Sequence, residues 1–298
     1  MRVKFYGVRG SVPVPGPSTA RYGGNTSCIE LRVSDEQHFI LDAGTGIREL
    51  GQDLVVNAKG KPIMSSLFIT HTHWDHIHGF PFFIPNYLPS TVLDVFGPFH
   101  FDKKLEEVFA LQMDYSYFPI STKQLMSNIT YHDLNETQFS VGDVKITTKI
   151  MNHPIICLGY RFEFNGKTVV YTGDNEPYYD VLSDPDQSEE ERAENRSIID
   201  ESNARTVDFA RDADLLIADS QYTPEEYPNH LGWGHSTWQD SITMATRAHV
   251  KKLVLFHHEV TRRDAEMDNF LQTARQYAKT QGSPVEILAA MEGLAVEA

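Results

Sequence analysis

The sequence predicts an α/β fold whose strands end in side chains of the kinds that bind metal. Short apolar runs, of the length typical of buried strands, are followed directly by His or Asp, as residues 66–70 are by His71. In open α/β sheets the active site lies at the carboxyl ends of the strands. The 298 residues, 41% of them hydrophobic, suffice for one large core, and no linker-like tract or repeat divides them. We therefore predict a single domain over residues 1–298.

Strands are predicted from runs rich in apolar and β-branched residues. The run at 144–150 alternates apolar or Thr side chains with Lys and Thr, as a strand with one buried face does. The run at 168–173 combines β-branched and aromatic residues and is closed by Gly. In chain order, the predicted strands span residues 3–8, 66–70, 144–150, 168–173 and 252–256.

Helices are predicted where apolar residues recur on one side of a helical turn. Ser236 and Gln239 have the S/T-x-x-E/Q spacing of a capping box, which predicts that a helix begins at this point. In the other segments the prediction depends on apolar positions three or four residues apart. The predicted helices span residues 101–113, 207–213 and 236–249.

The run HTHWDH at 71–76 is the most informative motif, because it places three imidazoles and one carboxylate within six residues. His71 and His73 alternate along an extended backbone and can point to the same side. Asp75 and His76 come from the following turn and can reach a second position nearby. Neutral imidazole and carboxylate suit zinc, and also manganese or iron. The motif therefore predicts a metal site.

A motif this short cannot complete two coordination shells, so further ligands are expected from other strand ends. His153, Asp174 and His257 each follow a predicted strand directly or closely. His258 competes with His257 for the last position, and the residue pattern by itself leaves both open.

Several motifs follow one another along nearly the whole chain: HTHWDH at 71–76, His153 before Pro154, Thr172-Gly173-Asp174, GHST at 234–237 and LVLFH at 253–257. Together they resemble the metallo-β-lactamase superfamily and, within it, the ribonuclease Z-like branch of phosphodiesterases. The resemblance implies a four-layer αββα sandwich that binds two divalent metal ions, with zinc favoured. It also implies the ligands: His71, His73 and His153 on one metal, Asp75, His76 and His257 on the other, and Asp174 bridging them.

Two neighbouring metals would lower the pKa of a shared water and so supply hydroxide for hydrolysis at neutral pH. Asp75 is placed to orient that hydroxide. A phosphodiester also needs its leaving alkoxide protonated, and we predict His235 for this role and for stabilising the phosphate. His235 precedes a predicted helix start, where free N–H groups favour an anion. Alternatively, His235 only supports its loop.

Charge indicates the size of the substrate. The chain has 41 acidic and 26 basic residues, a net charge of −15, and no basic tract of the sort that follows a long phosphate backbone. Ribonuclease Z carries a tRNA-binding arm, and we find no Gly- and Lys-rich counterpart between His76 and His153. A small phosphodiester, such as a cyclic nucleotide or cyclic phosphate, is therefore expected, and long nucleic acid is disfavoured.

Two other functions remain open from the sequence. The same metals could hydrolyse a lactone or another carboxylic ester, with Tyr222 or Tyr227 as the donor to the carbonyl. A protein of a different class would retain metals as a binding or sensor protein without turnover. Every expected ligand is present, which favours an enzyme.

The remaining predictions concern the surroundings of the site. Residues 183–205 form an acidic insertion, predicted as a loop or surface helix. Cys28 and Cys157 are too few for a disulfide framework, and we see no signal peptide or apolar run of membrane-spanning length. A cytoplasmic protein without membrane contact is expected. Aromatic residues beyond the 71–76 motif suggest either the interface of a homodimer or a pocket wall: Phe80, Phe82, Phe83, Tyr87 and Phe118.

Overall fold

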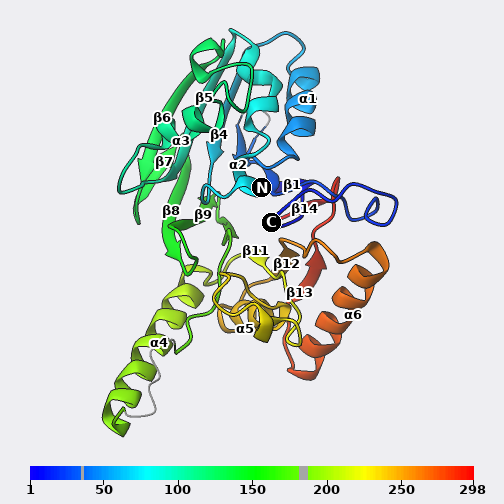
Figure 1. The fold of residues 1–298 in the computed structure, drawn as a ribbon. Coiled ribbons are helices and arrows are strands. Elements are labelled where there is room, and N and C mark those ends of the chain that lie inside the picture. Colours follow the sequence, from blue (N-terminus) through cyan, green and yellow to red (C-terminus); the bar gives the residue numbers. More distant parts are fainter. Residues whose placement is uncertain (35–36, 181–186) are drawn as a thin grey trace.

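The computed structural model describes residues 1–34, 37–180 and 187–298. Within them, two mixed β-sheets of seven strands each pack face to face, with helices on the outer faces (Figure 1). This arrangement confirms the predicted four-layer αββα sandwich. Among the described residues, no helix combines the length and apolarity needed to cross a bilayer.

The first sheet joins antiparallel N-terminal strands to parallel ones. Neighbours from β14 to β3 are antiparallel, whereas β3 to β6 run parallel. In spatial order its strands are β14 (Ala295–Glu297), β1 (Arg2–Gly7), β2 (Cys28–Arg32), β3 (His38–Leu41), β4 (Ile63–Phe68), β5 (Thr91–Pro98) and β6 (Asn128–Leu134).

The second sheet has the same division into antiparallel and parallel halves. Neighbours from β7 to β10 are antiparallel, and β10 to β13 run parallel. In spatial order its strands are β13 (Glu286–Ala289), β12 (Lys252–Phe256), β11 (Leu215–Asp219), β10 (Lys167–Tyr171), β9 (Cys157–Phe164), β8 (Val144–Met151) and β7 (Gln138–Val141). The predicted strands coincide with β1, β4, β8, β10 and β12 and differ from them only at their ends.

Aromatic side chains fill the space between the two sheets. Phe68 of β4 has its ring centroid 5.3 Å from that of Phe162 and 5.4 Å from that of Tyr160, both on β9. All three side chains are fully buried. Burial of one such side chain contributes about 1.5–3 kcal/mol, so this layer holds the sheets, and the strand ends beside them, in a fixed relation.

Helices cover the outer face of each sheet. The apolar side chains of α1 and α3 pack on the first sheet, and those of α5, α6 and the end of α4 pack on the second. The helices are α1 (Ile47–Ala58), α2 (Trp74–Ile77), α3 (Leu105–Gln112), α4 (Glu189–Phe209), α5 (Trp238–Arg247) and α6 (Asp264–Thr280). Short 3-10 helices are η1 (Phe80–Phe82), η2 (Ile84–Tyr87), η3 (Thr122–Gln124) and η4 (Tyr227–Asn229).

Two helix predictions need correction. The helix after His235 is capped by Thr237, whose hydroxyl accepts from the Asp240 amide, and it begins at Trp238. Ser236 is not the cap, because its hydroxyl donates to the carbonyl of Asn175. The separate helix predicted at 207–213 is wrong, since these residues include the last turn of α4.

The acidic insertion is largely helical. Ser188 and Glu191 form a capping box that begins α4, and this helix runs through the rest of the predicted insertion. Its buried side chains, Thr206, Val207 and Phe209, all lie near its C-terminal end, and the other end projects from the body (Figure 1). Residues 183–186 of the insertion lie outside the described residues.

Candidate metal centre

The two sheets bring their strand ends together at one place. Beyond β4 the chain passes through His71 and His73 and then turns into α2, which carries Asp75 and His76. From the second sheet, β8 leads to His153, β10 to Asp174 and β12 to His257. All seven predicted ligands therefore meet, although they are spread over 187 residues of sequence from His71 to His257.

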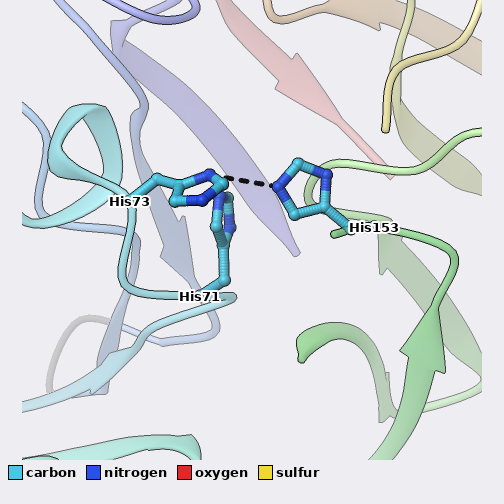
Figure 2. A group of neighbouring side chains, drawn as sticks. All are labelled: His71, His73 and His153. Carbon is cyan, nitrogen blue, oxygen red and sulfur yellow. Dashed lines mark hydrogen bonds between the residues drawn. The ribbon is translucent and has the colours of Figure 1, made fainter. Parts of the chain in front are cut away.

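The first group consists of His71, His73 and His153, which have ligand atoms within 4.8 Å of one another. Figure 2 shows the three rings converging from two segments, with His153 opposite the other two. His153 Nε2 lies 3.1 Å from His73 Nδ1. His71 is buried, whereas His73 is exposed, so this group opens toward solvent.

The second group consists of four buried side chains, Asp75, His76, Asp174 and His257. His257 Nε2 lies 3.1 Å from Asp75 Oδ2 and 3.3 Å from His76 Nε2. His76 Nε2 in turn lies 3.3 Å from Asp174 Oδ2. Burial alone would raise the pKa of Asp75, but the neighbouring His76 and His257 hold it well below its usual range.

Asp174 connects the two groups. Its Oδ2 atom lies 3.5 Å from His71 Nε2 in the first group and 3.3 Å from His76 Nε2 in the second. His71 Nε2 and Asp174 Oδ1 are buried and have no hydrogen-bond partner among the described residues. Buried polar atoms are almost always satisfied, so these two indicate that the site is built for a further group. An imidazole and carboxylate donor set fits zinc, manganese or iron.

A carboxylate that sequence reasoning missed fixes the orientation of His76. Asp42, directly after β3, has its Oδ2 atom 2.8 Å from His76 Nδ1. The same carboxylate accepts from Tyr171 and from the amide and hydroxyl of Thr70. Because a carboxylate must accept, Nδ1 carries the proton and Nε2 is free for a metal. The only sequence signal for Asp42 is its place at a strand end.

The rings of His257 and His153 are also held through Nδ1. His257 Nδ1 lies 2.8 Å from Gln221 Oε1, and His153 Nδ1 lies 3.0 Å from the Gly234 carbonyl oxygen. His258 differs, because its Nε2 is 2.8 Å from the Ala290 carbonyl oxygen, outside both groups. Burial lowers the pKa of His258 to about 3. The geometry thus brings His257, and not His258, into the second group.

His235 lies beside both groups and is paired with a second missed carboxylate. Its ring centroid is 4.9 Å from that of His257 and 5.5 Å from that of His153. Its Nδ1 atom lies 2.9 Å from Oδ2 of Asp219, the last residue of β11. Burial works against a charged His235, but the Asp219 carboxylate outweighs it and raises the pKa of His235 to about 9. The contact with Asp219 thus favours the protonated form of His235.

The start of α5 differs from the predicted anion site. Asp240 accepts from the amide and the hydroxyl of Thr237 at the start of α5. A carboxylate of the chain itself thus occupies the position at which an anion was expected.

The chain is similar to known hydrolases over most of its length. Residues 37–193 match the family model described as the beta-lactamase superfamily domain. Ribonuclease Z of Lactococcus lactis subsp. cremoris (strain SK11) is 26% identical, and the match covers 86% of this chain and 88% of that protein.

Solved structures show the same fold. The metallo-beta-lactamase fold protein YhfI from Bacillus subtilis superposes with a TM-score of 0.66 at 19% identity, covering 100% of this chain and 98% of that one. The short form of human tRNase Z superposes with a TM-score of 0.64, also at 19% identity, and the match covers 100% of this chain and 99% of that one.

Proposed function

The chain belongs to the β-lactamase superfamily, in its ribonuclease Z-like branch, and we propose that this metal-dependent hydrolase cleaves a phosphodiester bond in a small substrate. The substrate class that we favour is a cyclic nucleotide or a cyclic phosphate. The observation that carries the proposal is the position of His235, a buried proton donor beside both groups of predicted ligands. Phosphodiester cleavage needs such a donor, because an alkoxide leaves poorly without a proton.

We propose that the site binds two divalent ions, with zinc as the favoured metal. His71, His73 and His153 would hold one ion, Asp75, His76 and His257 the other, and Asp174 would contact both. When bound, such ions supply an activated water and neutralise charge on the phosphoryl oxygens.

The side chains of the protein would complete the reaction. Asp75 is held by the Ser11 amide, 2.7 Å from its Oδ2, and is thereby fixed to orient the attacking water. His235, held through Nδ1 by Asp219, donates a proton from Nε2 to the leaving oxygen.

RNA is the second candidate substrate, because the curated relatives at 23–26% identity include proteins named ribonuclease Z. Against it stands the charge of the chain, with 41 acidic and 26 basic residues. Affinity for a long phosphate backbone comes mainly from Lys and Arg. The projecting end of α4 instead begins with Glu189, Glu190 and Glu191, which would repel such a backbone.

Ester hydrolysis has less support than phosphodiester cleavage. The Tyr227 hydroxyl donates to Glu176 at 2.7 Å, so this donor is already engaged. Tyr222 is buried and its ring stacks on His230, with centroids 4.2 Å apart. A binding protein without turnover is the remaining alternative, and in it His235 and Asp219 would serve as ligands, because with Asp174 and His257 they form a third group that could hold a metal.

The test is a substrate panel with metal-loaded protein: cyclic mononucleotides, cyclic dinucleotides, bis(p-nitrophenyl) phosphate, a precursor tRNA with a 3′ trailer and a homoserine lactone. We expect turnover of small phosphodiesters that is lost in Asp75→Ala. Cleavage of the precursor tRNA alone would select the RNA alternative, and lactone turnover alone would overturn the proposal.

The role of His235 has its own test. His235→Ala should retain both metals and lose most turnover of cyclic nucleotides. Its effect on bis(p-nitrophenyl) phosphate should be much smaller, because p-nitrophenolate leaves without a proton. An equal loss with both substrates would contradict the assignment of His235 as the acid.

A further inference from the structure

A cavity of about 700 Å³ begins at the loop that carries the predicted metal ligands. Thr72 and Trp74, which alternate with His71, His73 and Asp75, form one side of it, and α3 with the residues that follow it forms another. A volume of 300–1,000 Å³ is typical of small-molecule sites. The cavity therefore borders the loop that carries the predicted ligands, and it is large enough for part of a substrate.

Aromatic side chains form walls of this cavity and remain accessible. Trp74 is 79% exposed and Tyr117 is 82% exposed, whereas Phe80 and Phe83 nearby in sequence are fully buried. Phe82 also lines the cavity and lies edge-on to Phe118, with ring centroids 5.4 Å apart. Accessible aromatic rings in a cavity favour a planar partner that stacks on them.

Two polar atoms in the wall lack hydrogen-bond partners among the described residues. They are Oε1 of Gln112 and Nε2 of His100, and both are buried. The Gln112 amide nitrogen donates to the Ile77 carbonyl at 2.7 Å, which fixes Oε1 as the free acceptor. Both atoms are closed to solvent in this structure, so a planar ring with N–H donors at its edge would satisfy Gln112 Oε1 and reach His100 Nε2 after a shift of the wall.

The charge of the wall favours a neutral ligand group. Lys103 lines the cavity but pairs with Asp102 at 3.0 Å, and both residues belong to the wall. Burial lowers the pKa of His100, which keeps its imidazole neutral. No cation of the wall is thus left to hold a phosphate, whereas the candidate metal centre next to it would.

We propose that this cavity binds the nucleobase attached to the scissile phosphodiester, with the aromatic walls stacking on the ring and Gln112 and His100 contacting its edge. The inference rests on the proposed function and extends it, because it names the part of the substrate that decides specificity. A free nucleotide and the end of an RNA chain both present such a base. The binding experiment described below distinguishes these two ligands.

The main test compares p-nitrophenyl esters that share a leaving group: thymidine 5′-(p-nitrophenyl phosphate), its adenosine counterpart and methyl p-nitrophenyl phosphate. Wild-type kcat/KM should be higher for a nucleoside ester than for the methyl ester by about tenfold, the effect of one base–aromatic stack. Tyr117→Ala should remove most of this preference and leave the methyl ester unchanged. Equal kcat/KM for all three esters in the wild type would overturn the proposal.

Tyr115→Ala is the matched control. Tyr115 is two residues away, is 66% exposed and hydrogen-bonds to Gln124, but it does not line the cavity. This variant should keep the preference for nucleoside esters. Loss of the preference in both variants would show a general disturbance of the segment and contradict a base site.

A binding experiment separates failure of this proposal from failure of the proposed function. Adenosine and thymidine 5′-monophosphate, and a trinucleotide RNA, should quench Trp74 fluorescence, and Trp74→Phe identifies the signal. Quenching without ester hydrolysis would reject the phosphodiesterase and retain the base site; quenching by the trinucleotide alone would name an RNA end as its source. An absence of quenching by any of them would overturn the proposal.

A measurement of oligomeric state gives a further test. If Tyr117→Ala changes the sedimentation of the protein and leaves its selectivity among the esters unchanged, the proposal is also overturned, because this face would then be an interface between two copies.

Discussion

Oδ2 of Asp219 accepts a hydrogen bond of 2.9 Å from Nδ1 of His235. This contact fixes the imidazole ring and leaves Nε2 as the nitrogen that can pass a proton to a substrate. The negative charge of Asp219 also stabilises the protonated ring. Asp219 therefore affects both the position and the protonation of His235. Both effects can be tested without changing a predicted metal ligand.

Asp219→Asn keeps the size of the side chain and removes its charge. We expect turnover of a cyclic nucleotide to fall about 100-fold, since general acid catalysis contributes on this scale, with both metals retained. Steady-state kinetics and metal analysis measure the two quantities. Turnover at the wild-type level with the Asn variant would show that His235 does not depend on this carboxylate.

Asp42→Asn should weaken metal binding by the second group. Asp42 has a φ of 59°, which Asn tolerates, so the backbone is retained. Loss of an outer carboxylate typically costs about 10- to 100-fold in metal affinity. Competition with a chelator measures the metal affinity of the variant and of the wild type. Tyr171→Phe, which removes a different bond to the same carboxylate, is the control and should have a smaller effect.

His257→Ala and His258→Ala should differ in metal content although the two residues are adjacent. We expect His257→Ala to lose the ion of the second group, because His257 Nε2 lies 3.1 Å from Asp75 Oδ2. His258→Ala should keep its metals and lose stability instead, since His258 is fully buried. Metal analysis and thermal unfolding distinguish the variants, and a metal loss confined to His258→Ala would reverse the assignment.

Asp214 should make stability depend on acid pH. Burial would raise the pKa of its carboxyl, but hydrogen bonds from Lys251, the Thr168 amide and Lys167 outweigh burial and lower it to about 2. Its contribution is therefore fully present above the ordinary pKa of 3.8 and is lost as the pH falls toward 2. Asp214→Asn should cost about 1–2 kcal/mol at pH 7.

Urea unfolding at pH 7 and at pH 3 tests this expectation. The difference between the wild type and Asp214→Asn should narrow at the lower pH. Asp212→Asn is the control, because the Asp212 side chain is 73% exposed and its pairing with His249 is long, at 3.7 Å. A constant difference across pH would mean that the Asp214 contacts do not depend on its charge.

The sequence alone could predict the fold and the residues that meet, because His71, Asp174 and His257 are ligand-type side chains at strand ends. It could not predict Asp42 or Asp219 in their roles. A single Asp after a strand is also an ordinary turn residue, and only the contacts with His76 and His235 reveal its purpose.

The start of α5 shows the same limit. Ser236 with Gln239 and Thr237 with Asp240 both satisfy the spacing of a capping box. The choice between them depends on a contact outside the helix, the hydrogen bond from Ser236 to the Asn175 carbonyl. Local patterns therefore locate a helix well and its first residue poorly.

The projecting half of α4 should have a lower local stability than the rest of the molecule. Since its buried side chains are confined to Thr206, Val207 and Phe209, its first turns draw little support from the core. Such a segment opens at a small fraction of the free energy of global unfolding. Its amides should exchange with solvent long before those of β11 or β12. A protease that cuts there would break the chain but leave the two sheets packed, so both groups of predicted ligands would stay in place. This helix is therefore a suitable place to attach a reporter.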